Sequence, residues 1–232
     1  MIKPKLKESV KAGIPIFVGY MPAAAAFGVL AKGCGLGMLE TFLFSALVFA
    51  GASQFMALNL LMAGMSAGGI ILATFLVNFR HFLMSAYLST RLDHQAKKVV
   101  PLIAFGVTDE VFSVLSFQGG RLSKTTVFSI QLCAYSAWVT GTLAGFFLGG
   151  FLPEILNQSM GVALYALFVA ILLPEVKKSR RALFLALSSG ALNATLIRFQ
   201  IFPDGWTIIA CIVIVALAGS LISETQGAGE EA

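Results

Sequence analysis

Apolar segments long enough to cross a lipid bilayer recur along the whole of this 232-residue chain. About 20 apolar residues in a helix span a hydrocarbon core of about 30 Å, and segments of this length leave no room for a separate soluble domain. The composition agrees, because 58% of the residues are hydrophobic and 12% are charged, against about 25% charged residues in soluble domains. The sequence therefore predicts an all-α, polytopic membrane bundle in which residues 1–232 form one membrane-embedded domain.

We expect about 7–8 transmembrane segments, some of them broken or re-entrant. Pro15 and Pro22 are expected to interrupt the first segment, and Gly51 with the polar Ser53 and Gln54 the second. Proline removes a backbone hydrogen bond and glycine loosens a helix. Transporters use such breaks to present helix ends to a substrate, and ordinary kinked packing is the alternative. The expected segments are residues 12–31, 41–63, 67–89, 99–118, 125–149, 159–174, 182–201 and 206–223.

The net charge of +5 comes from short basic clusters at the ends of the apolar segments. Such clusters are typical of membrane topology signals, so we expect no nucleic-acid partner. A cytoplasmic N-terminus places the larger basic set inside: Lys3, Lys5, Lys7, Lys11, Arg121, Lys124, Lys177, Lys178, Arg180 and Arg181. It places the smaller set outside: Lys32, Arg91, Lys97, Lys98 and Arg198. This balance predicts cytoplasmic termini, but the basic cluster 91–98 conflicts with it, and a re-entrant or half-spanning segment in the first half is the alternative.

Two adjacent acids, Asp109 and Glu110, interrupt the apolar segment 99–118. A charged side chain at bilayer depth costs roughly 2.5–3.5 kcal/mol, so such groups normally face a bundle interior, water or an opposite charge. Arg80 points away from its polar neighbours on the helix, and we expect it to pair with an acid. Four polar residues share one face of the third segment: Thr74, Asn78, His81 and Ser85.

Two further segments carry polar side chains at helical spacing: Gln131, Tyr135, Trp138 and Thr142 in the fifth, and Ser189, Asn193 and Gln200 in the seventh. These stripes predict either the wall of a hydrated path or interhelical hydrogen bonds. Gly141, Gly145 and Gly149 form a ridge of small residues, which lets a second helix, from this chain or from another subunit, approach closely.

Residue types that catalysis and metal binding require are sparse here. His81 and His94 are the two histidines, and the three cysteines are scattered, so we expect no metal site, no disulfide framework and no cofactor. There is also no nucleotide-binding motif in the sequence. An intramembrane enzyme that uses Ser53 with His81 is an alternative, but it lacks a third member, and a channel lacks an evident repeated filter.

The strings Phe49-Ala-Gly-Ala-Ser-Gln-Phe55 and Leu76-Val-Asn-Phe-Arg-His-Phe-Leu83, followed by Thr108-Asp109-Glu110, resemble the azaleucine-resistance (AzlC) family, the large subunits of bacterial branched-chain amino acid exporters. The resemblance implies an inner-membrane exporter that works with a small AzlD-type subunit, and that is not an enzyme. The family elements fall on Gly51, Ala52, Ser53, Gln54, Phe55, Asn78, Arg80, His81, Asp109 and Glu110.

The chemistry of these residues suggests how an amino acid would be bound. We expect the helix-break amides around Ala52 to Gln54, with Asn78 and Arg80, to receive the carboxylate, because helix N-termini favour anions. Asp109 would meet the ammonium group and Phe55 the aliphatic side chain. Asp109 or Glu110, with His81 as the alternative, would carry a proton inward as substrate moves outward.

Overall fold

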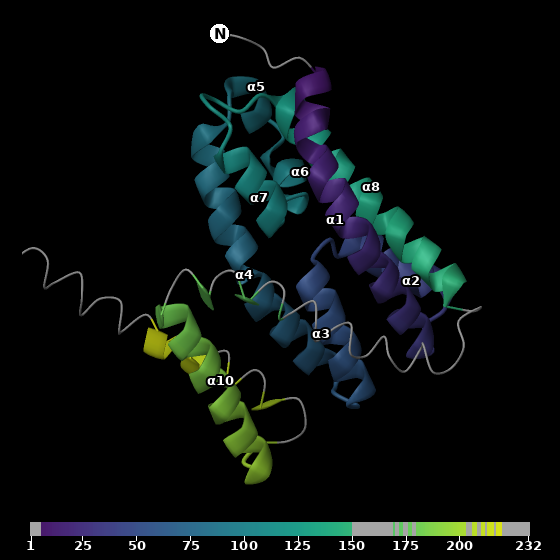
Figure 1. The fold of residues 1–232 in the computed structure, drawn as a ribbon, viewed down its shortest axis with the longest axis vertical. Coiled ribbons are helices and arrows are strands. Elements are labelled where there is room, and N and C mark those ends of the chain that lie inside the picture. Colours follow the sequence, from purple (N-terminus) through teal and green to yellow (C-terminus); the bar gives the residue numbers. More distant parts are fainter. Residues whose placement is uncertain are drawn as a thin grey trace, which may run out of the picture. The chain divides into compact units, whose positions relative to one another are not determined.

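A computed structural model describes residues 6–149, 169, 172–173, 176–177, 180–202, 206–207, 210–211, 213–215 and 217–219. This part of the chain is helical, with one isolated bridge between Leu92 and Leu122 (Figure 1). Three of its helices are long and apolar enough to cross a membrane: α1 (Leu6–Gly33), α4 (Ala67–Arg91) and α8 (Lys124–Leu148). The predicted helical membrane fold is therefore confirmed. Most of the expected segment 159–174 and much of 206–223 lie outside the described residues.

The chain divides into two compact units. The first unit comprises Met1–Leu58 and Asn78–Leu164, and the second comprises Asn59–Val77 and Tyr165–Ala232. In the second unit, α10 (Arg180–Arg198) carries Asn193, whose side-chain oxygen lies 3.9 Å from the sulfur of Cys211. Gln200 follows the end of this helix with a positive φ of 48°, so the expected helical stripe ends before it. All candidate site residues lie in the first unit.

Helices α1 and α8 run parallel and in close contact. A Cβ atom at Gly145 would meet the backbone of Ala25, and one at Gly28 would meet the backbone of Thr142 and Phe146. The glycine ridge on α8 therefore accommodates α1 of the same chain. Contrary to our expectation, α1 is continuous through Pro15 and Pro22, because packing along α8 outweighs the one backbone bond that each proline removes.

Helices α2 (Met38–Leu47) and α3 (Gly51–Met62) form the first hairpin. Phe44 of α2 and Phe55 of α3 both pack on Phe27, with ring centroids 5.8 and 5.6 Å from it, so α3 returns along α2. Phe49, in the turn, packs on Tyr20, which lies nearly two helical turns before Phe27 on α1. The expected crossing 41–63 was therefore wrong, because the chain reverses at residues 48–50. Gly51 makes this possible, since a side chain there would strike the ring of Trp138.

Helices α6 (Val100–Phe105) and α7 (Asp109–Ser116) form the second hairpin, after the short α5 (His94–Lys97). The carbonyl of Ile103 accepts a hydrogen bond from Gln131, in the first third of α8. At the far end of α7, the carbonyl of Ser116 accepts one from Arg91, the last residue of α4. Since Arg91 also bonds Leu122, just before α8, this hairpin returns to the end where α8 begins. The expected crossing 99–118 was also wrong.

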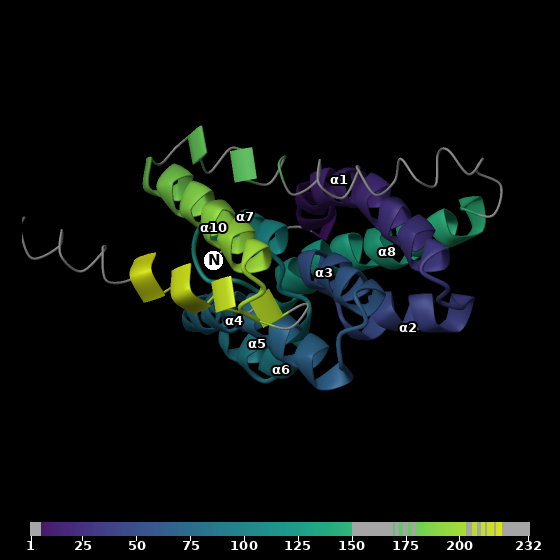
Figure 2. The ribbon, with the colours of Figure 1, turned by 90° about the horizontal axis from the view of Figure 1, so that it is seen from below.

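The two hairpins enter the first unit from opposite ends, and their tips meet half-way. The rings of Phe49 and Phe105 lie 6.5 Å apart, and both contact Tyr135. Tyr20 packs beside Phe49 and sits near the middle of the 28-residue α1. Because α1 is about 42 Å long, a bilayer centred on this helix would have the tips near its mid-plane. Figure 1 shows α6 and α7 near the N-terminal part of α1, and Figures 1 and 2 show α2 near its C-terminal part.

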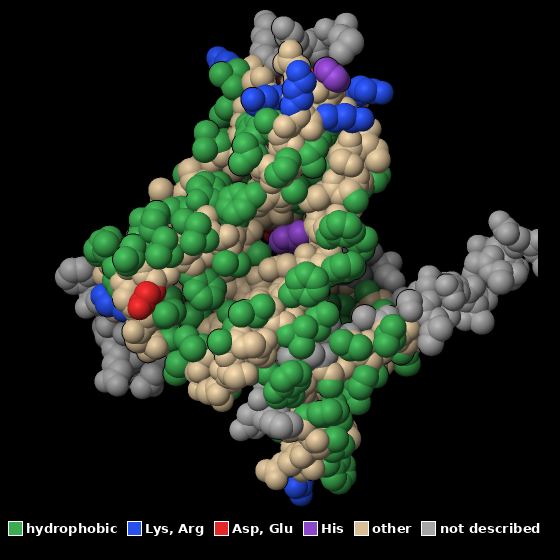
Figure 3. Space-filling model, turned by 180° about the vertical axis from the view of Figure 1, so that it is seen from behind, with side chains coloured by type: hydrophobic (Ala, Val, Ile, Leu, Met, Phe, Trp, Pro, Cys, Tyr) green, Lys and Arg blue, Asp and Glu red, His purple; other side chains and the backbone are tan. Residues whose placement is uncertain are grey.

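The hairpins bring most basic residues of the first unit to one end. The backbones of Arg91 and Asp93 bond to Leu122, so α5 with Lys97 lies beside the start of α8. Lys7 lies at the same end because α1 runs parallel to α8. Lysine and arginine side chains gather there in Figure 3. Our assignment of Arg91, Lys97 and Lys98 to the side opposite Lys124 was therefore wrong, because the second hairpin returns to the end where α8 begins.

The α1 and α8 interface makes a bulky residue at Gly145 costly. Overpacking a protein core costs about 1–3 kcal/mol, and here the obstacle is backbone, which cannot rotate away. We expect Gly145→Leu to lower the apparent melting temperature or the yield of monodisperse protein in detergent. Gly19→Leu, on an open face of α1 with nothing within 4 Å of the added Cβ, is the matched control. Equal behaviour of the two variants would contradict the packing described.

The hairpin arrangement also predicts which loops share a side of the membrane. Single cysteines at Gln95 and Lys124, each in a chain with its native cysteines replaced, should react with an impermeant maleimide from one side. The native Cys34, which follows the other end of α1, should react from the opposite side. If the cysteine at 95 reacts from the same side as Cys34, the segment before α6 crosses the bilayer.

Candidate functional site

Gln54 holds the reversal of the first hairpin together. Its side-chain nitrogen donates to the carbonyls of Phe44, at 2.8 Å, and Val48, and its oxygen accepts from the indole of Trp138 at 2.8 Å. The side chain is fully buried. Carbonyl groups at the end of a helix inside a membrane need such partners, because no water is there to supply them. Both side-chain amide protons of Gln54 are therefore committed to the fold, and its expected role in substrate binding stays a prediction.

The polar face of α8 bonds to the hairpins. Gln131 donates to the Ile103 carbonyl at 2.7 Å, and the Tyr135 hydroxyl donates to the Ala46 carbonyl at 3.0 Å. One turn beyond Trp138, Thr142 shares a hydrogen bond with Ser45 of α2 at 2.8 Å. Of the two interpretations of this stripe, the structure favours interhelical hydrogen bonds over the wall of a hydrated path.

Loss of the Gln54 amide should destabilise the protein more than a usual surface change. Gln54→Leu would leave the Trp138 indole N–H without its partner, which costs about 1–3 kcal/mol. It would also remove the side-chain donor from the Phe44 and Val48 carbonyls, which keep their backbone donors. We expect a large fall in thermal stability in detergent, with Gln95→Leu on the exposed face of α5 as the control. A variant at position 54 as stable as the control would show that water reaches this turn.

The first turn of α3 carries a small polar network with α4. Ser53 donates to the Ala50 carbonyl at 2.9 Å and accepts from the Asn78 amide at 3.0 Å. The oxygen of the Asn78 side chain is buried and has no hydrogen-bond partner in the structure. Ser53 is thus engaged with Ala50 and Asn78 rather than with His81. Phe55 points into the core, where it packs on Phe27.

The first turn of α7 carries both acids. Thr108 caps the helix by accepting the backbone N–H of Val111 at 3.3 Å. The Tyr20 hydroxyl lies 2.7 Å from the Thr108 hydroxyl and also forms a hydrogen bond with the Glu110 carboxylate. Carboxylates suit this position, because the N-terminus of a helix carries a partial positive charge. Sequence reasoning missed Tyr20; a tyrosine at the centre of an apolar segment was the available signal, since a buried phenol needs a partner.

Arg80 of α4 pairs with Asp109 of α7. The two charged groups are 2.8 Å apart, which confirms the expected pairing of Arg80 with an acid. Their side chains are 44% and 48% exposed in the structure. His81 is half-buried and lies close enough to interact electrostatically with Arg80, Asp109 and Glu110.

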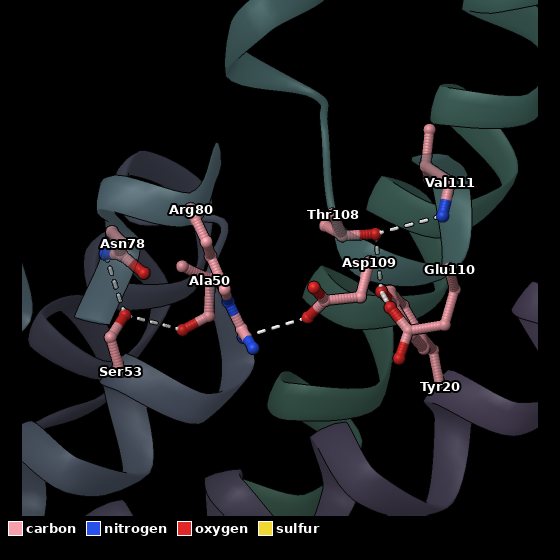
Figure 4. A network of polar contacts seen from close by, with 9 residues as sticks. All are labelled: Tyr20, Ala50, Ser53, Asn78, Arg80, Thr108, Asp109, Glu110 and Val111. Atoms are coloured by element: carbon pink, nitrogen blue, oxygen red, sulfur yellow. Dashed lines mark hydrogen bonds and ion pairs between the residues drawn. The ribbon is translucent and has the colours of Figure 1, made fainter. Parts of the chain in front are cut away.

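Figure 4 shows how these residues lie relative to one another. Ser53 and Asn78 are on one side of Arg80, and Asp109 and Glu110 are on the other. The first turns of two half-length helices therefore flank one cation at the depth of the bilayer centre. Arg80 balances one carboxylate, so the cluster keeps one further acid, Glu110, whose negative charge is not offset by a second cation among these residues.

The family model of the AzlC protein matches residues 15–152, which include both hairpins and every residue of this cluster. The chain belongs to the AzlC family. The inner membrane protein YgaZ of Escherichia coli is 33% identical to this chain, with 97% of this chain and 93% of that protein aligned. An uncharacterized membrane protein of Archaeoglobus fulgidus is 36% identical, with 95% of each chain aligned. The branched-chain amino acid transport protein AzlC of Bacillus subtilis is 25% identical, over 80% of this chain and 74% of that protein. No solved structure matches the chain.

Proposed function

We propose that this AzlC-family protein is the large subunit of a secondary-active exporter of branched-chain amino acids in the bacterial inner membrane. The observation that carries the proposal is the Arg80 and Asp109 ion pair, with Glu110 beside it, at mid-membrane depth between two half-helix N-termini. Charged groups at that depth are functional candidates by default. The printed name of the Bacillus subtilis relative supports the substrate class.

A zwitterionic amino acid suits this cluster because it can replace each partner of the ion pair. Its carboxylate would bind Arg80 and the N-terminal amides of α3 at Ala52 and Ser53, and its ammonium would bind Asp109. The unpartnered oxygen of Asn78 is a further acceptor for an ammonium proton. The Phe55 region would contact the aliphatic group, where one methylene is worth about 1–3 kcal/mol, so size is selected more than identity.

Glu110 is the group that we assign to proton coupling, with Asp109 and His81 as alternatives. Arg80 forms its ion pair with Asp109 rather than with Glu110. An inward-moving proton on Glu110 would then exchange for an outward-moving amino acid. No part of this scheme requires ATP.

The charged residues also suggest the orientation of the chain in the membrane and the kind of partner that it binds. The basic end of the first unit would be cytoplasmic under the positive-inside rule, which places the N-terminus inside. Arg80 and Asp109 remain partly exposed, and charged side chains do not face lipid, so further protein or water covers them in the membrane. A small AzlD-type subunit is our proposed partner.

Transport by purified protein tests the proposal. Proteoliposomes that contain this chain, with and without a small AzlD-type subunit, should exchange labelled leucine, isoleucine or valine across the membrane. Arg80→Gln and Asp109→Asn should each reduce the rate at least about tenfold, or about 1.4 kcal/mol, while Arg80→Lys keeps part of it. Glu8→Gln, on the exposed start of α1, is the control. Unchanged transport by both site variants, or a selective ionic current without exchange, would overturn the proposal.

Competition separates two-point binding from simple charge attraction. We expect unlabelled leucine to inhibit, whereas its decarboxylated amine and its deaminated acid, each lacking one charged group, should inhibit at least about tenfold less. If the amine or the acid competes as well as leucine, one of the two charged residues does not contact substrate.

A further inference from the structure

Tyr20 joins the middle of α1 to the tip of the second hairpin through its hydroxyl group. We propose that Tyr20 and Thr108 are positioning residues that link the protonation of Glu110 to the seating of the first turn of α7. The inference deepens the proposed function, because Glu110 is the group assigned there to proton coupling. It is argued from the three hydrogen bonds that meet at Tyr20 and Thr108.

A phenol has one proton, so it cannot donate to the Thr108 hydroxyl and to the Glu110 carboxylate at the same time. An ionised carboxylate can only accept. With Glu110 ionised, Tyr20 therefore donates to Glu110 and accepts from the Thr108 hydroxyl, which in turn accepts the N–H of Val111. Every proton in this series then points toward the negative charge, and each group is satisfied.

A proton on Glu110 reverses the order. The new carboxyl O–H donates to the Tyr20 oxygen, and the Tyr20 proton turns toward the Thr108 oxygen. Thr108 then accepts from both Tyr20 and Val111, and its own proton must find an acceptor outside the series. The same step removes a negative charge from the N-terminus of α7, where it was favourable. The Thr108 cap on Val111 is kept, but the loss of this charge weakens the first turn of α7, which holds Asp109 against Arg80.

The groups that face Glu110 come from three helices. Arg80 and His81 lie on α4, Asp109 precedes Glu110 on α7, and Tyr20 reaches it from α1. Helices α1 and α8, both described along their whole length, carry their charged side chains only near their ends. Protonation of Glu110 therefore changes the net charge of Arg80, Asp109 and Glu110 from −1 to zero, with His81 neutral.

The alternative is that the hydrogen bonds of Tyr20 only stabilise the fold. Tyr135 provides a matched control for this possibility. Tyr135 is a second tyrosine beside the hairpin tips, and its hydroxyl makes a part-buried hydrogen bond to the Ala46 carbonyl rather than to an acid. Tyr20→Phe and Tyr135→Phe each remove one hydroxyl group. A structural role predicts similar effects, whereas a positioning role predicts that only Tyr20→Phe alters the titration of Glu110.

Infrared spectroscopy of the full-length protein in lipid nanodiscs gives the decisive reading. Glu110→Gln identifies the carboxylic acid band of Glu110, which is followed as a function of pH. Because a hydrogen bond to a charged group is lost, Tyr20→Phe should move the appearance of this band to higher pH by about one to two pH units. The sign follows because the lost bond stabilised the ionised form. Thr108→Val should move it less in the same direction, and Thr108→Ser and Tyr135→Phe should match the wild type.

Two results would overturn the inference: wild-type protein without a titrating Glu110 band, or Tyr20→Phe with the wild-type midpoint. If Tyr20→Phe does not fold, the comparison of Thr108→Val with Thr108→Ser tests the same series of hydrogen bonds at Thr108. The spectroscopy requires no transport, so the expected shifts without amino acid exchange would refute the proposed function and leave this inference standing.

Discussion

Backbone groups inside a lipid bilayer must find partners within the protein, and the two hairpin tips of this chain depend on that constraint. Each tip interrupts a helix and leaves the carbonyl groups of its last turn near the middle of α1. Gln54, Gln131 and Tyr135 add side-chain donors to these carbonyls, beside the backbone N–H groups that bond to those of Phe44, Val48 and Ile103. Trp138 fixes Gln54 in turn. Helix α8 thus serves as a column of donors, and this is why a helix with so few charges carries so many polar side chains.

The same breaks create the conditions for charge at that depth. A continuous helix offers neither free amides nor an N-terminal dipole in the middle of a membrane, whereas α3 and α7 each begin there. Asp109 and Glu110 occupy the first turn of α7, and Arg80 balances one of them from α4. Binding of a zwitterion, as we propose, would then exchange one set of opposite charges for another without leaving an isolated ion in lipid.

Much of this arrangement could be predicted from residue types. Length and hydropathy gave the helical membrane fold, helical periodicity placed Gln131, Tyr135 and Trp138 on one face, and electrostatic cost predicted a partner for Arg80. The direction of the chain after a break could not be predicted, since Gly51 permits a kink and a reversal equally well. Residue spacing also cannot show that Gln54 donates to carbonyls six and ten residues before it, or that Tyr20 meets acids about ninety residues away.

The contact between α1 and α8 has a mechanical consequence. Where backbone touches backbone at Gly28 and Gly145, no side chain can change rotamer to relieve a shift, so sliding or tilting one helix against the other is resisted at several positions at once. The hairpin tips are held instead by individual hydrogen bonds and one ion pair, which can break separately. Elastic compliance in the first unit is therefore concentrated at the hairpin tips. Any motion that opens the site moves the short half-helices against the rigid pair formed by α1 and α8.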